Sequence, residues 1–327
     1  MKKIMITDCD HKDIIPEHQV FTKANMDFGI AQCKSREDVI EKCKGAIALI
    51  NQYAPLDAKV FKALPELKFV IRYGVGVDNI NIADATAFGV QVCNVPDYGV
   101  NEVADHALAL LLATTRKIVA IDAQVKNGGW DYSEAIPIRR PSTQTIGIVG
   151  VGRIGTAFAQ RVHALGYTVI GCDIEYGFIG RRFPEFVEFV DMDELLRRSD
   201  VVSLHCSLND QTKDLFDGKI FAKMKQGSFL INVSRGGLID EDALYQALES
   251  GKLAGAGIDV AKQEPMPPEH PLRTCDTIII TPHMAWYSED SAWELKEKCA
   301  LECVSFMNGK ELRYPINQIA KEEGKNK

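Results

Sequence analysis

Residues 146–155 read IGIVGVGRIG, and this stretch decides the fold. Gly150, Gly152 and Gly155 fit the pattern GxGxxG, which is weak alone because glycine is common and the spacing is short. The context strengthens it, because an apolar strand precedes the turn and a helix over residues 153–165 is expected after it. A strand, a glycine-rich turn and a helix in this order predict a dinucleotide-binding unit.

Each residue of this turn has a physical role in binding a dinucleotide. Gly150 permits the tight turn, Gly152 lets the backbone approach a pyrophosphate, and Gly155 lets the helix pack closely on the strand. The helix N-terminus offers unpaired N–H groups and a positive dipole end to phosphate. Asp173 ends the next apolar run, YTVIGCD, where it would accept hydrogen bonds from ribose hydroxyls.

The expected cofactor is NAD rather than NADP. Asp173 would repel a 2′-phosphate, and Ile174 follows it instead of an arginine. Arg181 and Arg182 lie near enough in the sequence to keep NADP as an alternative. A strand–helix turn that binds no nucleotide is the other alternative.

Length and composition describe a globular protein of two domains. The chain has 327 residues, 46% of them hydrophobic and 25% charged. A net charge of −7 provides no basic surface, so we expect no direct nucleic-acid partner. The start, MKKIMITDCDHKD, is not expected to act as a signal peptide, and no apolar run reaches membrane-spanning length, so no membrane partner is expected. The tail KEEGKNK is expected to fray.

Nine cysteines are scattered without a CxxC pair, which favours a reduced, cytoplasmic compartment and gives no reason to expect a metal site. Cys299 and Cys303 are spaced for one face of a helix, and we interpret them as buried or half-buried thiols.

The order of apolar runs predicts an α/β protein with two doubly wound parallel sheets. One long, largely buried helix over residues 101–118, capped by Asn101, is expected to lead from the first domain to the second. His106 within it is interpreted as structural. Strands are expected in KKIMITD, GAIALIN, LKFVIRYG, VQVCNVP, VVSLHC, SFLINV, LAGAGIDV and TIII, and helices in REDVIEKCK, DAKVFKAL, IADATAFG, DELLRRS, KIFAKM, EDALYQALES and SEDSAWELKEKCALECVSFMN.

Three chemically active residues follow successive strands of the second sheet: Arg235, Glu264 and His283. Ligands on such sheets bind beyond the carboxyl ends of the strands, so these side chains are expected to meet. Each alone is more often structural, but together beside a nicotinamide they indicate reduction of a 2-keto acid. Histidine can move the proton, a carboxylate fixes its tautomer and favours its protonated form, and arginine binds a carboxylate with paired hydrogen bonds and polarises the carbonyl.

The blocks VGRIG, HCSLNDQTKDLF, LINVSRGGLIDEDAL, AGIDV, QEP and TPH resemble those of the D-isomer-specific 2-hydroxyacid dehydrogenases, in that family's order and over nearly the whole chain. The resemblance implies that Arg235 binds the substrate carboxylate and carbonyl, Glu264 tunes the histidine, and His283 is the acid/base. It also places further residues at the cofactor, with Asp259 near the nicotinamide carboxamide: Arg153, Ile154, Cys206, Ser234 and Asp259.

The same resemblance implies a domain organisation and a dimer. A Rossmann NAD-binding domain over 100–285 would be inserted into a flavodoxin-like substrate domain formed by 1–99 and 286–327, with a homodimer formed through the nucleotide domain. The stretch RYGVGVDN could be an ordinary strand-end turn or an anion-binding one. It matches the family's substrate-carboxylate loop, which implies that Val75 and Gly76 contact the substrate.

TPHMAWYSEDS and VCNVP resemble the C-terminal-binding-protein-like branch of the family. We expect the chain to be most similar to this branch and to the phosphoglycerate dehydrogenase-like branch. Trp286 would then wall the substrate pocket, and a core or dimer-face aromatic is the alternative. Ala261 and Lys262 depart from the bulky or acidic residues common at their positions.

The first hypothesis is therefore an NAD-dependent dehydrogenase of a small 2-hydroxy acid with an apolar or aromatic side chain. The second is an NAD(H)-sensing dimeric scaffold that binds a protein partner, as a corepressor would. A methyltransferase of similar fold leaves Arg235, Glu264 and His283 unexplained.

Overall fold

A computed structural model describes residues 3–180 and 182–319 of the chain. The expectations for Arg181 and for the tail 321–327 lie outside these residues. The chain divides into two compact units: Met1–Gly99 with Ser288–Lys327 forms unit 1, and Val100–Tyr287 forms unit 2. In the described residues, no helix is long and apolar enough to cross a membrane.

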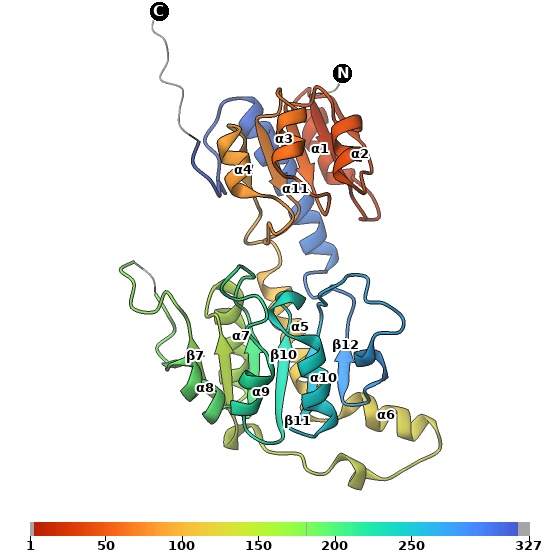
Figure 1. The fold of residues 1–327 in the computed structure, drawn as a ribbon, viewed down its shortest axis with the longest axis vertical. Helices are drawn as coiled ribbons and strands as arrows, with labels where there is room; N and C mark the ends of the chain where they lie inside the picture. The colour runs from red at the N-terminus through yellow and green to blue at the C-terminus, as the bar shows by residue number, and fades with distance from the viewer. Residues whose placement is uncertain (1–2, 181, 320–327) are drawn as a thin grey trace, which may run out of the picture. The chain divides into compact units, whose positions relative to one another are not determined.

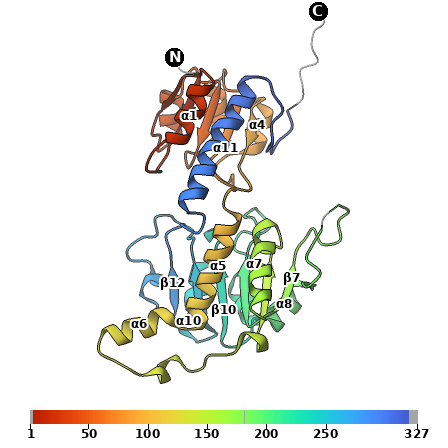
Figure 2. The same ribbon diagram turned by 180° about the vertical axis from the view of Figure 1, so that it is seen from behind.

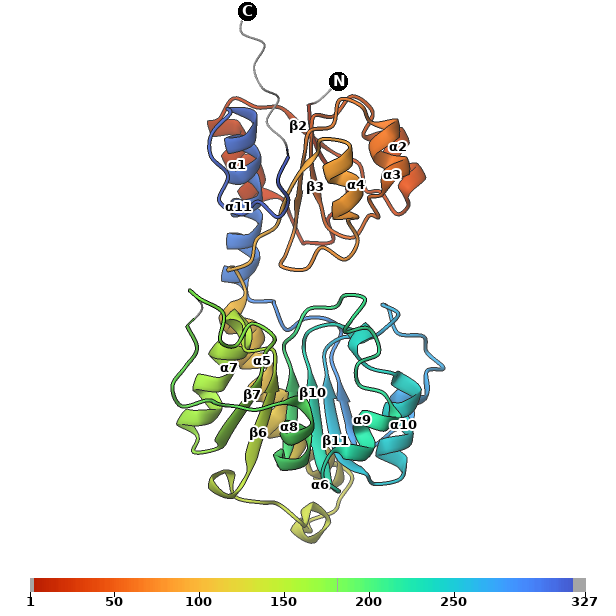
Figure 3. The ribbon, with the colours of Figure 1, turned by 60° about the vertical axis from the view of Figure 1, so that its left-hand side comes forward.

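Unit 1 is a parallel sheet with helices on both faces. Its elements are β1 (Ile4–Ile6), α1 (Ile15–Lys23), β2 (Phe28–Ile30), α2 (Arg36–Lys42), β3 (Ala48–Asn51), α3 (Ala58–Ala63), β4 (Phe69–Arg72), α4 (Ile82–Ala87), β5 (Gln91–Cys93) and α11 (Glu289–Met307). The five described strands follow the order β2-β1-β3-β4-β5 and all pair in parallel. Helices α1 and α11 lie on one face and α2, α3 and α4 on the other (Figure 3). This is the flavodoxin-like order.

The sequence explains why these elements form. Strand β3 is buried at every position, as a central strand covered on both faces requires, and its residues ALIN are a short apolar run. Helices α2, α3 and α4 each begin at an N-cap residue whose side chain accepts a hydrogen bond from a first-turn amide, namely Ser35, Asp57 and Asn81. Cys299 and Cys303 are fully buried on α11, as predicted.

The edge of the unit 1 sheet at β5 is closed by the segment 315–317. Ile316 N donates to Val92 O at 2.8 Å. The Asn317 side chain continues the pairing, because Oδ1 accepts from Val92 N at 2.7 Å and Nδ2 donates to Val90 O at 2.9 Å. An edge strand satisfied in this way offers few backbone groups to another chain.

Unit 2 is a second doubly wound sheet. Its elements are α5 (Val100–Thr115), α6 (Ile118–Lys126), β6 (Thr145–Val149), α7 (Arg153–Ala164), β7 (Thr168–Cys172), β8 (Glu188–Phe189), α8 (Met192–Arg198), β9 (Val201–Leu204), α9 (Gly218–Lys223), β10 (Ser228–Asn232), α10 (Glu241–Glu249), β11 (Leu253–Ile258) and β12 (Ile278–Ile280), with short 3-10 turns between them. The seven described strands follow the order β12-β11-β10-β9-β6-β7-β8. When β6 is numbered 1 and the sheet is read from the β8 edge, the order begins 3-2-1-4-5-6, as in a Rossmann fold.

The helices of unit 2 also cover both faces of its sheet. Helices α8, α9 and α10 lie in front of it in Figure 1, and α5 and α7 lie in front when the molecule is seen from behind in Figure 2. The two parallel sheets confirm the predicted fold class.

The predicted long helix is wrong at its C-terminal end. Helix α5 ends at Thr115 because Lys117 adopts the left-handed conformation, with φ of +54°, and a new helix, α6, begins at Ile118. It also begins at Val100, so Asn101 lies inside it rather than capping it. The short strands β2 and β8 were not predicted, since runs of two or three residues carry no readable periodicity. Helix α1 was not predicted either, because only Pro16, Glu17 and Phe21 of its nine residues are buried, which leaves no apolar stripe in the sequence.

Helix α6 and the segment after it carry exposed apolar side chains. Trp130 is 89% exposed, and the others are Ile118, Val119, Tyr132 and Ile136. Figure 2 shows α6 extending away from the sheet of unit 2. Exposed apolar side chains concentrated in one segment favour a protein–protein contact there.

Candidate active site

The glycine-rich turn between β6 and α7 can be made only by glycine at two positions. Gly150 has φ of +89°, and a Cβ there would lie 2.7 Å from Cys206 N. A Cβ on Gly155 would lie 2.1 Å from Gly150 O, so the helix could not approach the turn. The backbone therefore forms a tight cradle at the carboxyl end of β6.

The helix that follows the cradle has no side-chain cap. Gly152 is the N-cap residue of α7 and has no side chain to accept a hydrogen bond, so the first-turn amides remain for a ligand. Asp173, just after β7, accepts from Val151 N at 2.7 Å and from Glu175 N at 2.8 Å, which holds its carboxylate beside the turn. A glycine cradle, an uncapped helix and an acid at the end of the next strand fit a bound dinucleotide.

Two further residues predicted at the cofactor lie after neighbouring strands. The backbone of Cys206, after β9, packs against Gly150, and burial raises the pKa of its thiol to about 11, so it stays protonated. Ser234, after β10, donates from Oγ to Leu204 O at 3.0 Å and from its amide to Asn232 Oδ1 at 3.1 Å. These bonds tie together the ends of β9 and β10.

His283 and Glu264 form the closest histidine–acid pair of unit 2. Nδ1 of His283 lies 2.6 Å from Oε2 of Glu264, and the side chains are 31% and 36% exposed. The other carboxylate oxygen of Glu264 accepts from Ala261 N at 2.9 Å. Burial raises the pKa of Glu264, but the hydrogen bond and charge of His283, the Ala261 amide and the charge of Arg235 outweigh it, and the pKa falls below its usual value. Glu264 is therefore ionised at neutral pH.

Arg235 reaches this pair through the packing of two loops. A Cβ on Gly236 would lie 1.9 Å from Ala261 C, so the loop after β10 contacts the loop after β11 with no side chain between them. Arg235 Nη1 donates to Ser234 O at 2.7 Å. The structure thus brings Arg235, Glu264 and His283 together at the carboxyl ends of three adjacent strands.

Asp259 has a contact set that the sequence did not reveal. It is 1% exposed, and its carboxylate accepts from Thr281 Oγ1 at 2.5 Å, Met284 N at 3.0 Å and Ala285 N at 2.8 Å. Its own carbonyl accepts from His283 N at 2.7 Å. Because His283 has φ of +54°, the turn that carries it is strained for a non-glycine residue, and Asp259 holds that turn in place.

His106 of α5 belongs to the same network. Its Nε2 lies 2.9 Å from Thr281 Oγ1 and 3.6 Å from Asp259 Oδ1. Reading it as structural overlooked this link to the residues around His283. No local pattern could have revealed it, since the partner lies in a distant part of the sequence.

The remaining predicted substrate contacts fall in different places. Val75 and Gly76 belong to unit 1, in the loop after β4, where Asn94 Nδ2 donates to Val75 O at 2.6 Å. Trp286 belongs to unit 2, is half-buried, and meets Tyr287 edge to face with ring centroids 5.6 Å apart. The loop with Ala261 and Lys262, which departs from the family pattern, still presents Glu264 to His283.

The two doubly wound units, the dinucleotide cradle and the histidine–glutamate pair beside an arginine define the class of NAD-dependent dehydrogenases. Residues 108–285 match the family model described as "D-isomer specific 2-hydroxyacid dehydrogenase, NAD binding domain". The chain belongs to the D-isomer-specific 2-hydroxyacid dehydrogenase family, and its cofactor is NAD.

Known relatives carry names from this family. A glyoxylate reductase of Korarchaeum cryptofilum is 37% identical over 291 residues, covering 87% of this chain and 86% of that protein. A glycerate dehydrogenase of Methylorubrum extorquens is 37% identical over 284 residues, covering 84% and 87%. A D-3-phosphoglycerate dehydrogenase of Archaeoglobus fulgidus is 35% identical over 298 residues, but the match spans only 56% of that longer protein.

Solved structures agree with these relatives. A glyoxylate reductase from Paecilomyes thermophila has a TM-score of 0.85 at 28% identity, covering 96% of this chain and 97% of that one. The D-lactate dehydrogenase from Aquifex aeolicus, in complex with NAD and lactic acid, has a TM-score of 0.83 at 27% identity, covering 94% and 96%.

Proposed function

We propose that this enzyme interconverts a small 2-keto acid and its D-2-hydroxy acid, with His283 as the acid/base, Glu264 as its partner and Arg235 as the substrate-binding cation. The observation that supports these roles best is the 2.6 Å pair of His283 Nδ1 and Glu264 Oε2 at the strand ends that also carry Arg235. A titratable ring, an ionised acid and a fixed cation beside a nucleotide cradle are the groups that carbonyl reduction requires.

The roles follow from the hydrogen bonds. Because Glu264 accepts from Nδ1–H of His283, the ring presents Nε2 to a substrate. NADH held in the glycine cradle would supply the hydride for C2. Protonated His283 then gives its Nε2 proton to the carbonyl oxygen, and the Glu264 charge stabilises the ring while it is a cation. Arg235 holds the substrate carboxylate and polarises the carbonyl.

The cofactor contacts in this proposal are the turn and strand-end residues described above. Gly150, Gly152 and Gly155 shape the cradle, Arg153 and Ile154 provide first-turn amides of α7, and the remaining predicted contacts are Asp173, Cys206, Ser234 and Asp259. Unit 2 is then the NAD-binding domain and unit 1 the substrate domain. Val75 and Gly76 are assigned to the substrate carboxylate on the family resemblance alone.

For the substrate, we propose a small acid such as glyoxylate or hydroxypyruvate, because relatives over most of the chain are named glyoxylate reductase and glycerate dehydrogenase. Trp286 is the reason to keep acids with an apolar or aromatic side chain in the test. The experiment is NADH oxidation with glyoxylate, hydroxypyruvate, pyruvate and phenylpyruvate, repeated with NADPH. No turnover above background with any acid would contradict the proposal, and preference for NADPH would contradict the role of Asp173.

A homodimer through unit 2 is the proposed assembly. The exposed apolar side chains of α6 and the following segment, with Trp130 at 89% exposure, support it. Sedimentation of the wild type and of Trp130→Lys tests this: we expect a dimer that the substitution weakens, and a wild-type monomer contradicts it.

The finer branch assignment supports a second candidate function. The resemblance of TPHMAWYSEDS to C-terminal-binding proteins favours an NAD(H)-dependent scaffold for a protein partner, whereas the relatives named above are enzymes. Capture of partners with and without NADH separates them, because a scaffold requires a partner held only with dinucleotide. For either function we propose a cytoplasmic location, which the nine free cysteines favour.

A further inference from the structure

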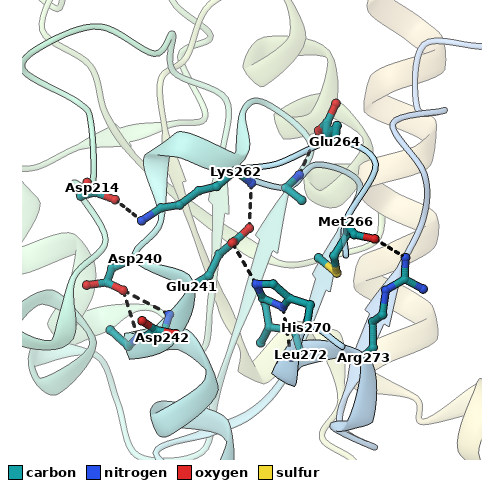
Figure 4. A network of polar contacts seen from close by, with 12 residues as sticks. Asp214, Asp240, Glu241, Asp242, Lys262, Glu264, Met266, His270, Leu272 and Arg273 are labelled. Atoms are coloured by element: carbon teal, nitrogen blue, oxygen red, sulfur yellow. Dashed lines mark hydrogen bonds and ion pairs between the residues drawn. The ribbon is translucent and has the colours of Figure 1, made fainter. Parts of the chain in front are cut away.

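A second histidine–acid pair, formed by Glu241 and His270, contacts the loop that carries Glu264 (Figure 4). Glu241, the first residue of α10, has Oε2 3.2 Å from Nε2 of His270. Its other oxygen, Oε1, accepts from Lys262 N at 2.8 Å. The Glu241 side chain itself is 12% exposed.

The amide that Glu241 holds is next to the one that Glu264 holds. Glu264 Oε1 accepts from Ala261 N, and Glu241 Oε1 accepts from the following amide, Lys262 N. Two carboxylates from different elements therefore restrain successive peptide groups of one loop. Glu264 is the proposed partner of the catalytic histidine, whereas Glu241 contacts the loop from the start of α10.

The Lys262 side chain extends the restraint to a third segment. Its Nζ lies 2.6 Å from Asp214 Oδ1 (Figure 4). Asp214 N in turn donates to Gly237 O at 2.8 Å. Since Gly236 packs directly on Ala261, the loops that carry Arg235 and Glu264 are joined by backbone packing, by this ion pair and by Glu241.

We propose that Glu241 is a positioning residue of the reaction: it holds the loop over residues 261–264 so that Glu264 meets Nδ1 of His283, with the Lys262–Asp214 ion pair as an auxiliary restraint. This inference rests on the proposed roles of Glu264 and His283. The physical reason is the geometric sensitivity of catalysis, in which a displacement of about 1 Å can cost about 10²-fold in rate.

Glu241 can be replaced without removing the start of its helix. Asp240 is the N-cap of α10, and its Oδ1 accepts from Asp242 N at 3.1 Å and Ala243 N at 3.2 Å. The charged groups that face Glu241 are His270 and the Lys262 side chain, with Asp240 and Asp242 beside it on α10. Glu241→Ala therefore tests the loop restraint while the cap remains.

The experiment measures glyoxylate or hydroxypyruvate reduction, whichever turns over, by four variants: Glu241→Ala, Glu241→Gln, Asp242→Ala and Glu264→Gln. Glu241→Ala should lower kcat about 10-fold with NADH affinity unchanged. The alkaline limb of its kcat/KM profile should move to lower pH, as in Glu264→Gln, because both changes weaken the acid that stabilises protonated His283. Glu241→Gln keeps an acceptor for Lys262 N and should restore most activity, and Asp242→Ala, a change in the same helical turn, should behave as wild type.

The outcomes separate the inference from the function on which it rests. Wild-type kinetics for Glu264→Gln contradict the proposed function itself. An impaired Glu264→Gln beside a Glu241→Ala enzyme with wild-type kcat and pH profile overturns the positioning role alone. So does a loss in Glu241→Ala that only follows the unfolded fraction in thermal unfolding, with the pH profile unchanged.

Discussion

The pairs His283–Glu264 and His270–Glu241 have the same chemical groups in different surroundings. The first is 2.6 Å long with a histidine 31% exposed, and the second is 3.2 Å long with a histidine 18% exposed. His270 Nδ1 accepts from Leu272 N at 3.3 Å, so both of its ring nitrogens are occupied. In the described part of the chain, no hydrogen bond joins Nε2 of His283. His283 therefore has a ring nitrogen left for a substrate, whereas both ring nitrogens of His270 already have protein partners.

The largest effect expected from this comparison is at the pair of His283 and Glu264, in which Nε2 of the histidine has no partner among the described residues. His283→Ala should lower kcat by about 10²–10⁴-fold because the proton donor is lost, while NADH binding survives. Single-turnover reduction and NADH fluorescence titration measure the two quantities. Unimpaired reduction would remove His283 from the acid/base role.

The next largest effect is expected at Arg235, the cation beside His283 and Glu264. Arg235→Ala should raise KM and lower kcat, with a combined loss of roughly 10²-fold in kcat/KM, since both substrate binding and carbonyl polarisation depend on the guanidinium. Steady-state kinetics test this, and Arg235→Lys is the control that retains charge without the paired geometry. If Arg235→Ala retains wild-type kinetics, Arg235 lies outside the reaction.

A third histidine, His205, sharpens the comparison because it has no acid partner among the described residues. Nε2 of His205 pairs with Ser203 Oγ at 2.8 Å, its buried Nδ1 has no hydrogen-bond partner among the described residues, and burial lowers its pKa to about 3. The unfolded ring takes up a proton near pH 6.5, whereas the folded ring stays neutral until about pH 3. Stability is therefore lost as pH falls through this window, by up to about 1.4 kcal/mol per pH unit.

His205→Gln removes that titration and keeps a partner for Ser203. Its free energy of unfolding, from denaturant titrations between pH 7 and 4, should depend less steeply on pH than that of the wild type. Parallel pH dependences for the two proteins would show that His205 is not the group responsible.

The smallest effect is expected at the pair of His270 and Glu241, in which both ring nitrogens of the histidine have partners. His270→Ala should cost about 1 kcal/mol of stability, because Leu272 N and Glu241 each lose a partner, yet leave kcat within about 3-fold of wild type, because Glu241 still holds Lys262 N. Thermal unfolding and steady-state rates compare the two. A drop in kcat as large as that of His283→Ala would mean that the two pairs do not differ as described.

Sequence reasoning reached those parts of the site whose signal is local. Gly150, Gly155 and Asp173 are visible because the turn, the helix start and the strand end are consecutive in the chain. The meeting of Arg235, Glu264 and His283 was predictable because parallel strands place their carboxyl ends at one edge of the sheet.

The parts that sequence reasoning missed depend on contacts between distant segments. Asp259 looks like any acid after a strand until Met284 N and Ala285 N are seen to donate to it. The link from His106 to Thr281, and that from Glu241 to Lys262, join different elements with no shared motif. The helix breaks after Thr115 because Lys117 adopts the left-handed conformation, and a lysine in the sequence does not indicate that conformation.

The closure of β5 by residues 315–317 has a consequence for biosynthesis. Unit 2 is one continuous stretch of chain, whereas unit 1 obtains α11 and the cover over β5 from residues 289–317, which follow unit 2 in the sequence. During translation, unit 2 therefore has all of its elements before unit 1 does, and domains generally fold as units as they emerge. The first hundred residues must wait, with only α1 on one face of their sheet, until residues 289–317 leave the ribosome.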